Sequence, residues 1–244
     1  MIKSHEPLLQ LTDVETFIGP YHILHGVTFE LYRGETLVLL GRNGVGKTTT
    51  LRTLMGLWPC SKGEILLDGE PLHGRSTEQI ASRGIGYVPE NMGIFASLTV
   101  EENMLVAAPG LNRSGLSESP RLARIFEAFP ALEKFWRTAA GNLSGGQKQM
   151  LAVARAWIEP KPLLVIDEPT KGLAPSIVDA MAALFEESHR DGVTILLVEQ
   201  NLSFASRLAE RVIIMESGRI VHTGVMRELM ADQVLQDDLL GLAL

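Results

Sequence analysis

Hydrophobic residues follow two different patterns along this chain, and together they predict a mixed α/β fold. Short runs of consecutive apolar residues, typical of strands buried on both faces of a parallel sheet, occur at 36–40, 85–88, 163–166 and 193–198. Residues 8–33 instead alternate apolar with polar positions around a break at Gly19-Pro20. This alternation predicts an antiparallel β element beside the parallel sheet.

Helical spacing of apolar residues accounts for most of the remaining chain. Helices are predicted over 49–57, 99–107, 121–129, 148–158 and 176–189, with a short one after Ser76. Thr99 with Glu102, and Ser76 with Gln79, have the spacing of a capping box at a helix start. A hairpin of strands is expected at 211–215 and 218–221, and an amphipathic helix from Met226 onward.

The order of these elements predicts one domain with an insertion. No strand pattern lies between Pro89 and Pro160, so a helical block (90–159) is expected to interrupt an α/β core made of 1–89 and 160–222. A helical tail, 223–244, completes the single domain of 1–244. Within the block, residues 109–120 are rich in Gly, Ser and Pro and predict a mobile surface loop.

A glycine-rich loop joins the first apolar run to the helix that follows it. It matches the phosphate-loop pattern of glycine, any four residues and then Gly-Lys-Thr, and comprises Gly41, Arg42, Asn43, Gly44, Val45, Gly46, Lys47, Thr48 and Thr49. Backbone N–H groups of such a loop can surround phosphate oxygens. Lys47 is expected to reach the β- and γ-phosphates of a nucleotide, and the Thr48 hydroxyl to bind Mg²⁺.

Two acids directly follow a later buried run. Asp167 and Glu168 come after the strand predicted at 163–166, at the carboxyl end of a parallel strand, where α/β proteins bind ligands. Asp167 is expected to serve Mg²⁺, directly or through water. Glu168 is expected to accept a hydrogen bond from the water that attacks the γ-phosphate.

A second candidate phosphate site precedes the helix predicted at 148–158. It is formed by the backbone N–H groups of this helix start and by the Ser144 hydroxyl, and comprises Ser144, Gly145, Gly146 and Gln147. One phosphate loop and a separate phosphate-binding helix start in one chain predict a dimer. In such a dimer each helix start completes the site of the other chain.

Composition and charge narrow the possible partners. The single cysteine, Cys60, suits a reducing compartment, and 244 residues with 45% hydrophobic content can form a core without disulfides. A formal charge of −7, with no run of Lys or Arg, argues against DNA or RNA as a partner. The chain has no apolar run near the roughly 18 residues of a membrane span, so a cytoplasmic location is expected, with any membrane contact made through a partner.

Over nearly its whole length the chain resembles the ATP-binding subunits of ABC transporters. Four segments carry the resemblance in this order and spacing: 41–49, 143–147, 163–169 and 171–175. The resemblance implies an ABC ATPase fold, which is a P-loop NTPase core of RecA type with an inserted helical subdomain. It also implies head-to-tail dimerisation around two ATP molecules with Mg²⁺, and attachment to transmembrane permease subunits at the cytoplasmic face of the inner membrane.

Within this family, segments 89–91, 172–175 and 198–201 are most similar to the ATPases of importers for branched-chain amino acids and of relatives that import urea, amides or other small polar solutes. Glu90 stands where most members have glutamine, and can still sense the γ-phosphate side through Mg²⁺ or water. Gln200 stands where most have histidine; its amide can donate a hydrogen bond to the γ-phosphate but cannot carry a proton. Adenine stacking would fall to Ile18, where relatives tend to have tyrosine, or to Phe17 beside it.

These observations favour a transport ATPase that powers uptake, with a periplasmic or extracellular solute-binding protein as an indirect partner. Glu90 and Gln200 also leave open a regulatory nucleotide-binding partner of low activity. A soluble ABC-type ATPase acting on ribosomes or DNA ranks last, because the chain has one cassette, no heptad run and an acidic charge. The second ATP-binding subunit can be a copy of this chain or a different one.

Overall fold

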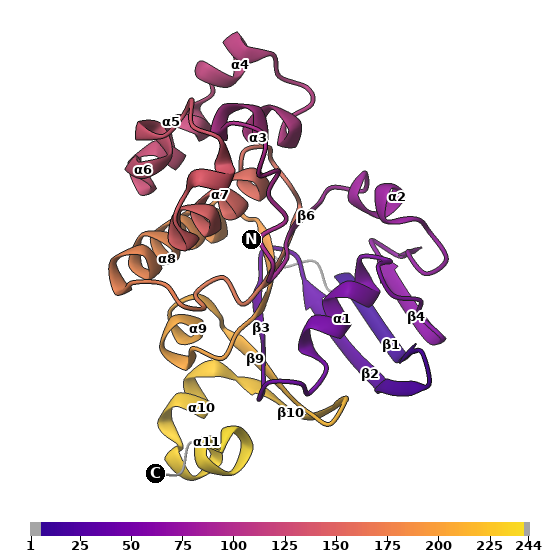
Figure 1. Cartoon of the computed structure of the whole chain (residues 1–244). Coiled ribbons are helices and arrows are strands. Elements are labelled where there is room, and N and C mark those ends of the chain that lie inside the picture. The colour runs from indigo at the N-terminus through magenta and orange to yellow at the C-terminus, as the bar shows by residue number, and fades with distance from the viewer. Residues whose placement is uncertain (1–5, 242–244) are drawn as a thin grey trace.

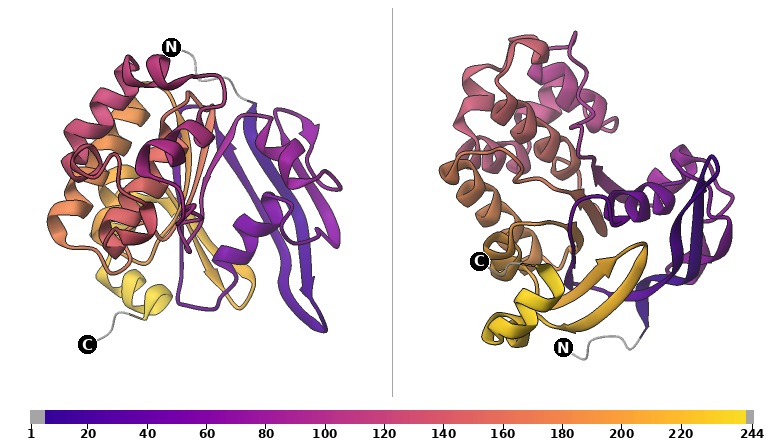
Figure 2. Two further views of the ribbon diagram at one scale, coloured as in Figure 1. Left: turned by 45° about the horizontal axis from the view of Figure 1, so that its top comes forward. Right: turned by 60° about the horizontal axis from the view of Figure 1, so that its bottom comes forward.

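Two β-sheets and the helices around them make up residues 6–241, the part of the chain that the computed structural model describes (Figure 1). One sheet is antiparallel, with the order β2-β1-β4-β5, and consists of β1 (Pro7–Ile18), β2 (Tyr21–Tyr32), β4 (Lys62–Leu67) and β5 (Glu70–Pro71). The predicted antiparallel element is therefore confirmed. It stands beside the second sheet in both views of Figure 2.

The second sheet is mostly parallel and has the order β10-β9-β3-β8-β7-β6. Its strands are β3 (Thr36–Leu40), β6 (Ile85–Val88), β7 (Leu163–Asp167), β8 (Thr194–Val198), β9 (Arg211–Glu216) and β10 (Arg219–Val225). The four apolar runs predicted as parallel strands are β3, β6, β7 and β8, so these predictions are confirmed. The predicted hairpin is also confirmed, and β9 additionally pairs parallel with β3.

Residues of β3 are buried on both faces of the second sheet. Leu37 and Leu39 pack into a core shared with the antiparallel sheet, whereas Val38 and Leu40 pack into a core on the helical side. All five residues of β3 are buried, as are all five of β7 and of β8. A continuous apolar run, rather than an alternating one, is what burial on two faces requires.

Helices fill the chain between β6 and β7. They are α3 (Val100–Ala107), α4 (Arg113–Ser117), α5 (Pro120–Ala128), α6 (Pro130–Lys134), a 3-10 turn (Ala140–Asn142) and α7 (Gly145–Trp157). They gather at one end of the molecule, away from the antiparallel sheet (Figure 1). The other helices are α1 (Lys47–Leu54), α2 (Thr77–Ala81), α8 (Pro175–Arg190), α9 (Leu202–Leu208), α10 (Met226–Ala231) and α11 (Gln233–Leu240).

Local hydrogen bonds confirm two predictions and correct two others. Both predicted capping boxes, at the starts of α2 and α3, are formed. The stretch 109–120 is not simply a loop, because the Asn112 side chain caps α4 and Leu116 is buried beneath it. The tail is not one helix either: Asp232 ends α10 and caps α11 by accepting a hydrogen bond from the Leu235 N–H. Residues 242–244 of the predicted tail lie outside the described part of the chain.

A buried acid links three segments of the helical block. Glu101, in the first turn of α3, is only 5% exposed. Its Oε2 accepts a hydrogen bond of 2.8 Å from Arg113 at the start of α4, and another from Arg137, which follows α6. Hydrogen bonds between charged groups are stronger than neutral ones, so this carboxylate is expected to stabilise the packing of α3 against both segments.

Replacing Glu101 with Gln should lower the free energy of unfolding by about 1.5–3 kcal/mol, because the charge-assisted hydrogen bonds to Arg113 and Arg137 are lost. Urea unfolding followed by circular dichroism measures the change. Glu127→Gln, at an exposed position on α5, is the matched control and should stay within about 0.5 kcal/mol of the wild type. Equal stability of Glu101→Gln and the control would show that the buried acid does not hold the block together.

Candidate nucleotide site

The phosphate loop begins where β3 ends and closes at the first residue of α1. Gly41 has a φ of 147°, and a Cβ there would lie 2.4 Å from the carbonyl oxygen of Met215. Gly44 also has a positive φ, of 80°, but a Cβ there would meet nothing within 4 Å. Gly41 is thus required by contacts within the protein, whereas the backbone at Gly44 faces open space in which a ligand can come close.

Lys47 is folded back onto its own loop. Its Nζ donates hydrogen bonds to the carbonyl oxygens of Gly41 (2.8 Å) and Arg42 (3.0 Å) and lies 3.4 Å from Oε1 of Glu168. A pocket of about 280 Å³ opens in front of this loop and is lined by Asn43, Gly44, Gly46, Lys47, Thr48, Thr49, Glu90 and Glu168. The structure therefore brings the phosphate loop together with two of the acids singled out in the sequence.

Thr48 and Asp167 form a pair that suits a hard divalent cation. The Thr48 hydroxyl donates a hydrogen bond of 3.1 Å to Oδ1 of Asp167, while the buried Oδ2 has no hydrogen-bond partner among the described residues. Burial raises the pKa of Asp167 to about 6; the Thr48 hydrogen bond opposes this, and the charges of Glu90 and Glu168 add to it. A buried carboxylate oxygen without a partner is costly, and a bound cation would remove that cost.

The Thr48 hydroxyl and the Asp167 carboxylate suit Mg²⁺ both as oxygen ligands and in their small number. Residues 6–241 contain no group of three or more His, Cys, Asp or Glu side chains placed to hold a metal ion. Mg²⁺ is usually held by one or two protein groups together with substrate phosphates and water. The Thr48 hydroxyl and the Asp167 carboxylate therefore suffice, provided that a nucleotide supplies the remaining oxygens.

Glu168 is held by contacts from three directions. Its backbone N–H donates to the carbonyl oxygen of Val198 at 2.9 Å, and its φ of 47° places it in the left-handed region. Oε1 accepts a hydrogen bond from the Gln200 side-chain amide, which also donates to Oδ1 of Asn43 at 2.7 Å. Oε2 lies 3.6 Å from Nζ of Lys171. Gln200, predicted to act near the γ-phosphate, thus connects Glu168 with the phosphate loop.

Glu199 was not among the predicted site residues, but it shapes the loop that carries Gln200. Its buried carboxylate accepts hydrogen bonds from the Thr170 hydroxyl (2.7 Å) and from the N–H groups of Gln200 (2.9 Å) and Asn201 (3.0 Å). Burial raises the pKa of Glu199, and these hydrogen bonds oppose the rise. An acid placed directly after a buried strand, as in the pair at 167–168, was the available sequence signal.

The second predicted phosphate site lies elsewhere on the chain. None of residues 144–147 lines the pocket at the phosphate loop. The Ser144 hydroxyl accepts a hydrogen bond from the Gln147 N–H (3.3 Å), and the Gln147 side chain accepts one from the Ser144 N–H (2.9 Å), which forms a capping box. Ser144 and Gly145 are exposed at the start of α7. One chain alone therefore does not bring the two predicted phosphate-binding segments together.

Phe17 and Ile18 lie at the end of β1, outside the residues that line the pocket. Phe17 is 42% exposed, and its ring stacks on the His22 ring with centroids 4.1 Å apart. An exposed, already stacked aromatic surface can take a further ring. Adenine stacking on Phe17 stays a prediction.

Comparison with known proteins agrees with this geometry. A family model described as ABC transporter matches residues 24–171, which include the phosphate loop, 144–147, Asp167 and Glu168. The chain belongs to the ABC transporter family. Its cassette binds ATP and hydrolyses it, as the members of this family do. The predicted α/β ABC ATPase fold and the predicted ATPase activity are thereby confirmed.

The similarity to individual known proteins extends over nearly the whole chain. The chain is 38% identical to the high-affinity branched-chain amino acid transport ATP-binding protein BraG of Pseudomonas aeruginosa, over 96% of this chain and 100% of that protein. It is 32% identical to the probable branched-chain amino acid transport ATP-binding protein LivF of Archaeoglobus fulgidus, over 91% and 93%. A solved ATP-binding subunit of an ABC transporter superposes with a TM-score of 0.82 at 30% identity, over 93% and 94%.

No helix among residues 6–241 has both the length and the apolar character needed to cross a membrane.

Replacing Asp167 with Asn should stabilise the nucleotide-free, Mg²⁺-free protein at pH 8. The pKa of Asp167 is raised from 3.8 to about 6, so the folded state binds more protons between these values and loses stability as pH rises through them. The gain at pH 8 is expected to be on the order of 2–3 kcal/mol and to shrink toward pH 4.

Thermal melting from pH 4 to pH 8 measures this difference. Asp238→Asn, at an exposed position on α11, is the control and should show no such trend. A difference between wild type and Asp167→Asn that does not change with pH would rule out the buried carboxylate as its source.

Proposed function

We propose that this chain is the ATP-hydrolysing subunit of an importer for branched-chain amino acids or a related small polar solute such as urea or an amide. The observation that carries the ATPase role is the meeting of the phosphate loop, Asp167 and Glu168 at the carboxyl ends of β3 and β7. The substrate class is supported by the printed functions of BraG and LivF, both of which are named as branched-chain amino acid transport proteins.

In this proposal the residues of the site act on the phosphates, the attacking water or Mg²⁺. Lys47 exchanges the carbonyl oxygens of Gly41 and Arg42 for phosphate oxygens, and Gln200 donates its amide N–H to the γ-phosphate. Glu168 accepts a hydrogen bond from the water and orients it for in-line attack. Thr48 and Asp167 would hold Mg²⁺, with Glu90 acting through water, and the ion would supply positive charge to the phosphate oxygens.

A dimer would complete the site. Ser144 and Gly145 are exposed, and none of residues 144–147 lines the pocket of its own chain, so a partner cassette can present its own 144–147 segment to the nucleotide. A dimeric ATP-binding cassette bound to ADP and Pi supports this arrangement; it is 25% identical, with a TM-score of 0.80, over 90% of this chain and 99% of that one. The partner cassette is either a second copy or a homologous subunit.

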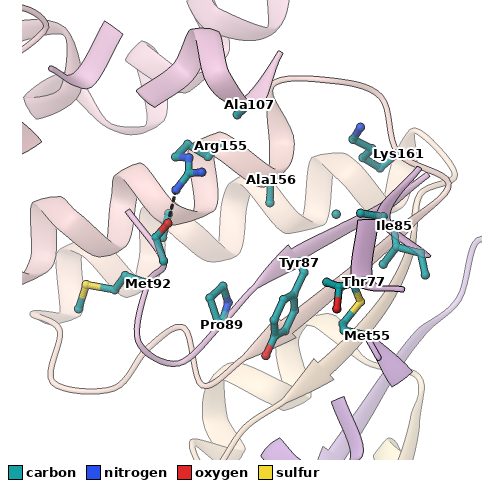
Figure 3. Close-up of a pocket in the computed structure, with 14 residues that line it drawn as sticks. Met55, Thr77, Ile85, Tyr87, Pro89, Met92, Ala107, Arg155, Ala156 and Lys161 are labelled. Carbon is teal, nitrogen blue, oxygen red and sulfur yellow. Dashed lines mark hydrogen bonds between the residues drawn. The ribbon is translucent and has the colours of Figure 1, made fainter. Parts of the chain in front are cut away.

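Transmembrane permease subunits would dock beside the loop that carries Glu90. A pocket of about 390 Å³ lies there between the core and the helical block (Figure 3), lined among others by Met55, Pro89, Met92 and Ala156. Nε of Arg155 is buried in it without a hydrogen-bond partner in the described part of the chain. We infer that a short apolar segment of the permease with a hydrogen-bond acceptor fills this pocket.

Docking to a permease would place the chain at the cytoplasmic face of the inner membrane. Through the permease it would be coupled indirectly to an external solute-binding protein.

Glu168→Gln should lower the rate of ATP hydrolysis by about 100-fold or more, because a neutral amide is a far weaker base than a carboxylate and cannot take a proton from the attacking water. ATP binding should persist, and the variant should accumulate as a dimer with Mg·ATP in size-exclusion chromatography with mass determination. Glu127→Gln on α5 is the control and should hydrolyse ATP like the wild type. Hydrolysis by Glu168→Gln at the wild-type rate would contradict the catalytic role proposed for Glu168.

Uptake by cells that lack this chain tests the transported solute and the docking pocket. We expect loss of labelled leucine uptake with no change for unrelated sugars; selective loss of urea or amide uptake would instead assign the related solute class.

The docking pocket is tested by returning variants to the same cells. Ala81→Trp, which fills the pocket from the exposed end of α2, should keep hydrolysis by the purified chain but fail to restore uptake. Ala123→Trp, exposed on α5, should restore it. Full uptake with Ala81→Trp would contradict docking in this pocket.

A further inference from the structure

One lysine stands between two acids at the mouth of the nucleotide pocket. Lys171 lies in the loop between β7 and α8, and its side chain is 58% exposed. Its Nζ is 2.7 Å from Oε1 of Glu90 and 3.6 Å from Oε2 of Glu168. A single ammonium group thus connects the loop after β6 with the loop after β7.

The contact between Lys171 and Glu168 matters because the other groups that touch the Glu168 carboxylate are expected to move when ATP binds. Lys47 lies 3.4 Å from the other carboxylate oxygen of Glu168, but in an ATPase it has to turn to the phosphates. Gln200 donates to the same oxygen and is likewise expected to turn to the γ-phosphate. Lys171 has no such task, so it can stay beside Oε2 while Oε1 is released. The hydrogen bond and charge of Glu90 raise the pKa of Lys171, so the pair favours the charged ammonium group.

Glu90 competes for the same ammonium group from the side of the docking pocket. Its neighbour Pro89 lines the pocket of Figure 3, together with Met92 and Gly93 from the same loop. A partner that enters this pocket must contact the loop and can shift Glu90 toward or away from Lys171. The contact between Lys171 and Glu168 would strengthen or weaken accordingly, without any change in the residues that touch the phosphates.

We propose that Lys171 is a positioning residue that holds Oε2 of Glu168, leaving Oε1 for the attacking water, and that Glu90 regulates it by sharing its ammonium group. The inference rests on the role proposed above for Glu168. It makes Lys171 the physical link between occupancy of the docking pocket and hydrolysis. It also explains how an acid at position 90 is tolerated so close to Asp167 and Glu168.

A double-mutant cycle on Glu90 and Lys171 tests this link, with hydrolysis measured at saturating Mg²⁺. Lys171→Gln should lower kcat by about tenfold, the loss of one charge-assisted contact, while KM for ATP stays within about twofold. Lys171→Arg should restore most of the rate. Glu90→Gln should change kcat by at least about threefold in the wild type but by less than about twofold in Lys171→Gln, because the two residues act through one contact. Lys134→Gln, exposed on α6, is the matched control and should leave kcat unchanged.

Amide hydrogen exchange of segment 168–174 in the nucleotide-free protein gives a readout that does not depend on turnover. Either single substitution should speed exchange, and the double variant should add nothing further. Additive effects in both assays, an unchanged kcat in Lys171→Gln, or no rescue by arginine would overturn the proposal. Failure of the Glu168 role would appear separately, as wild-type turnover in Glu168→Gln, while the exchange data would still report whether Lys171 joins the two loops.

Discussion

The register of three central parallel strands is the constraint on which the whole nucleotide site depends. Val198 of β8 pairs with Leu39 of β3 on one side and with Asp167 of β7 on the other. The chain continues these pairings past the strand ends, where the Glu199 N–H donates to Leu39 and the Glu168 N–H to Val198. A shift of one residue in any strand would turn each side chain to the opposite face and separate the acids from the phosphate loop.

Burial on both faces keeps this register in place. The same strands supply alternate side chains to two separate cores, one against the antiparallel sheet and α1, the other against α7, α8 and α9. Because both cores would be disrupted by a slip, the energetic penalty for misalignment comes from two sides at once. The polar groups of the site can therefore cluster at the strand ends, where acids such as Asp167 are costly to bury, without loosening the sheet.

Strands and short motifs could be predicted from the sequence, whereas contacts between loops that are distant in the sequence could not. The strands β3, β7 and β8 follow from their apolar runs, and the phosphate loop and the acids at 167–168 from short motifs next to them. α4 was missed because glycine, serine and proline dominated that stretch, although the Asn112 cap and the buried Leu116 decide its conformation. The contacts of Gln200 and Lys171 with Glu168 depend on loops that only the folded sheet brings together, so spacing in the sequence carries no signal for them.

The left-handed backbone of Glu168 has a consequence for the speed of the enzyme. A positive φ is uncommon for a non-glycine residue, and at Glu168 it is accompanied by a hydrogen bond from the backbone N–H to Val198 in the adjacent strand. The main chain of the acid is therefore fixed, and its carboxylate can change partners only by rotating side-chain bonds, which takes picoseconds to nanoseconds. Movements of whole loops and cassettes take microseconds to milliseconds. Rotation of the Glu168 side chain is therefore much faster than the loop movements around it, so the acid can follow those movements without delaying them.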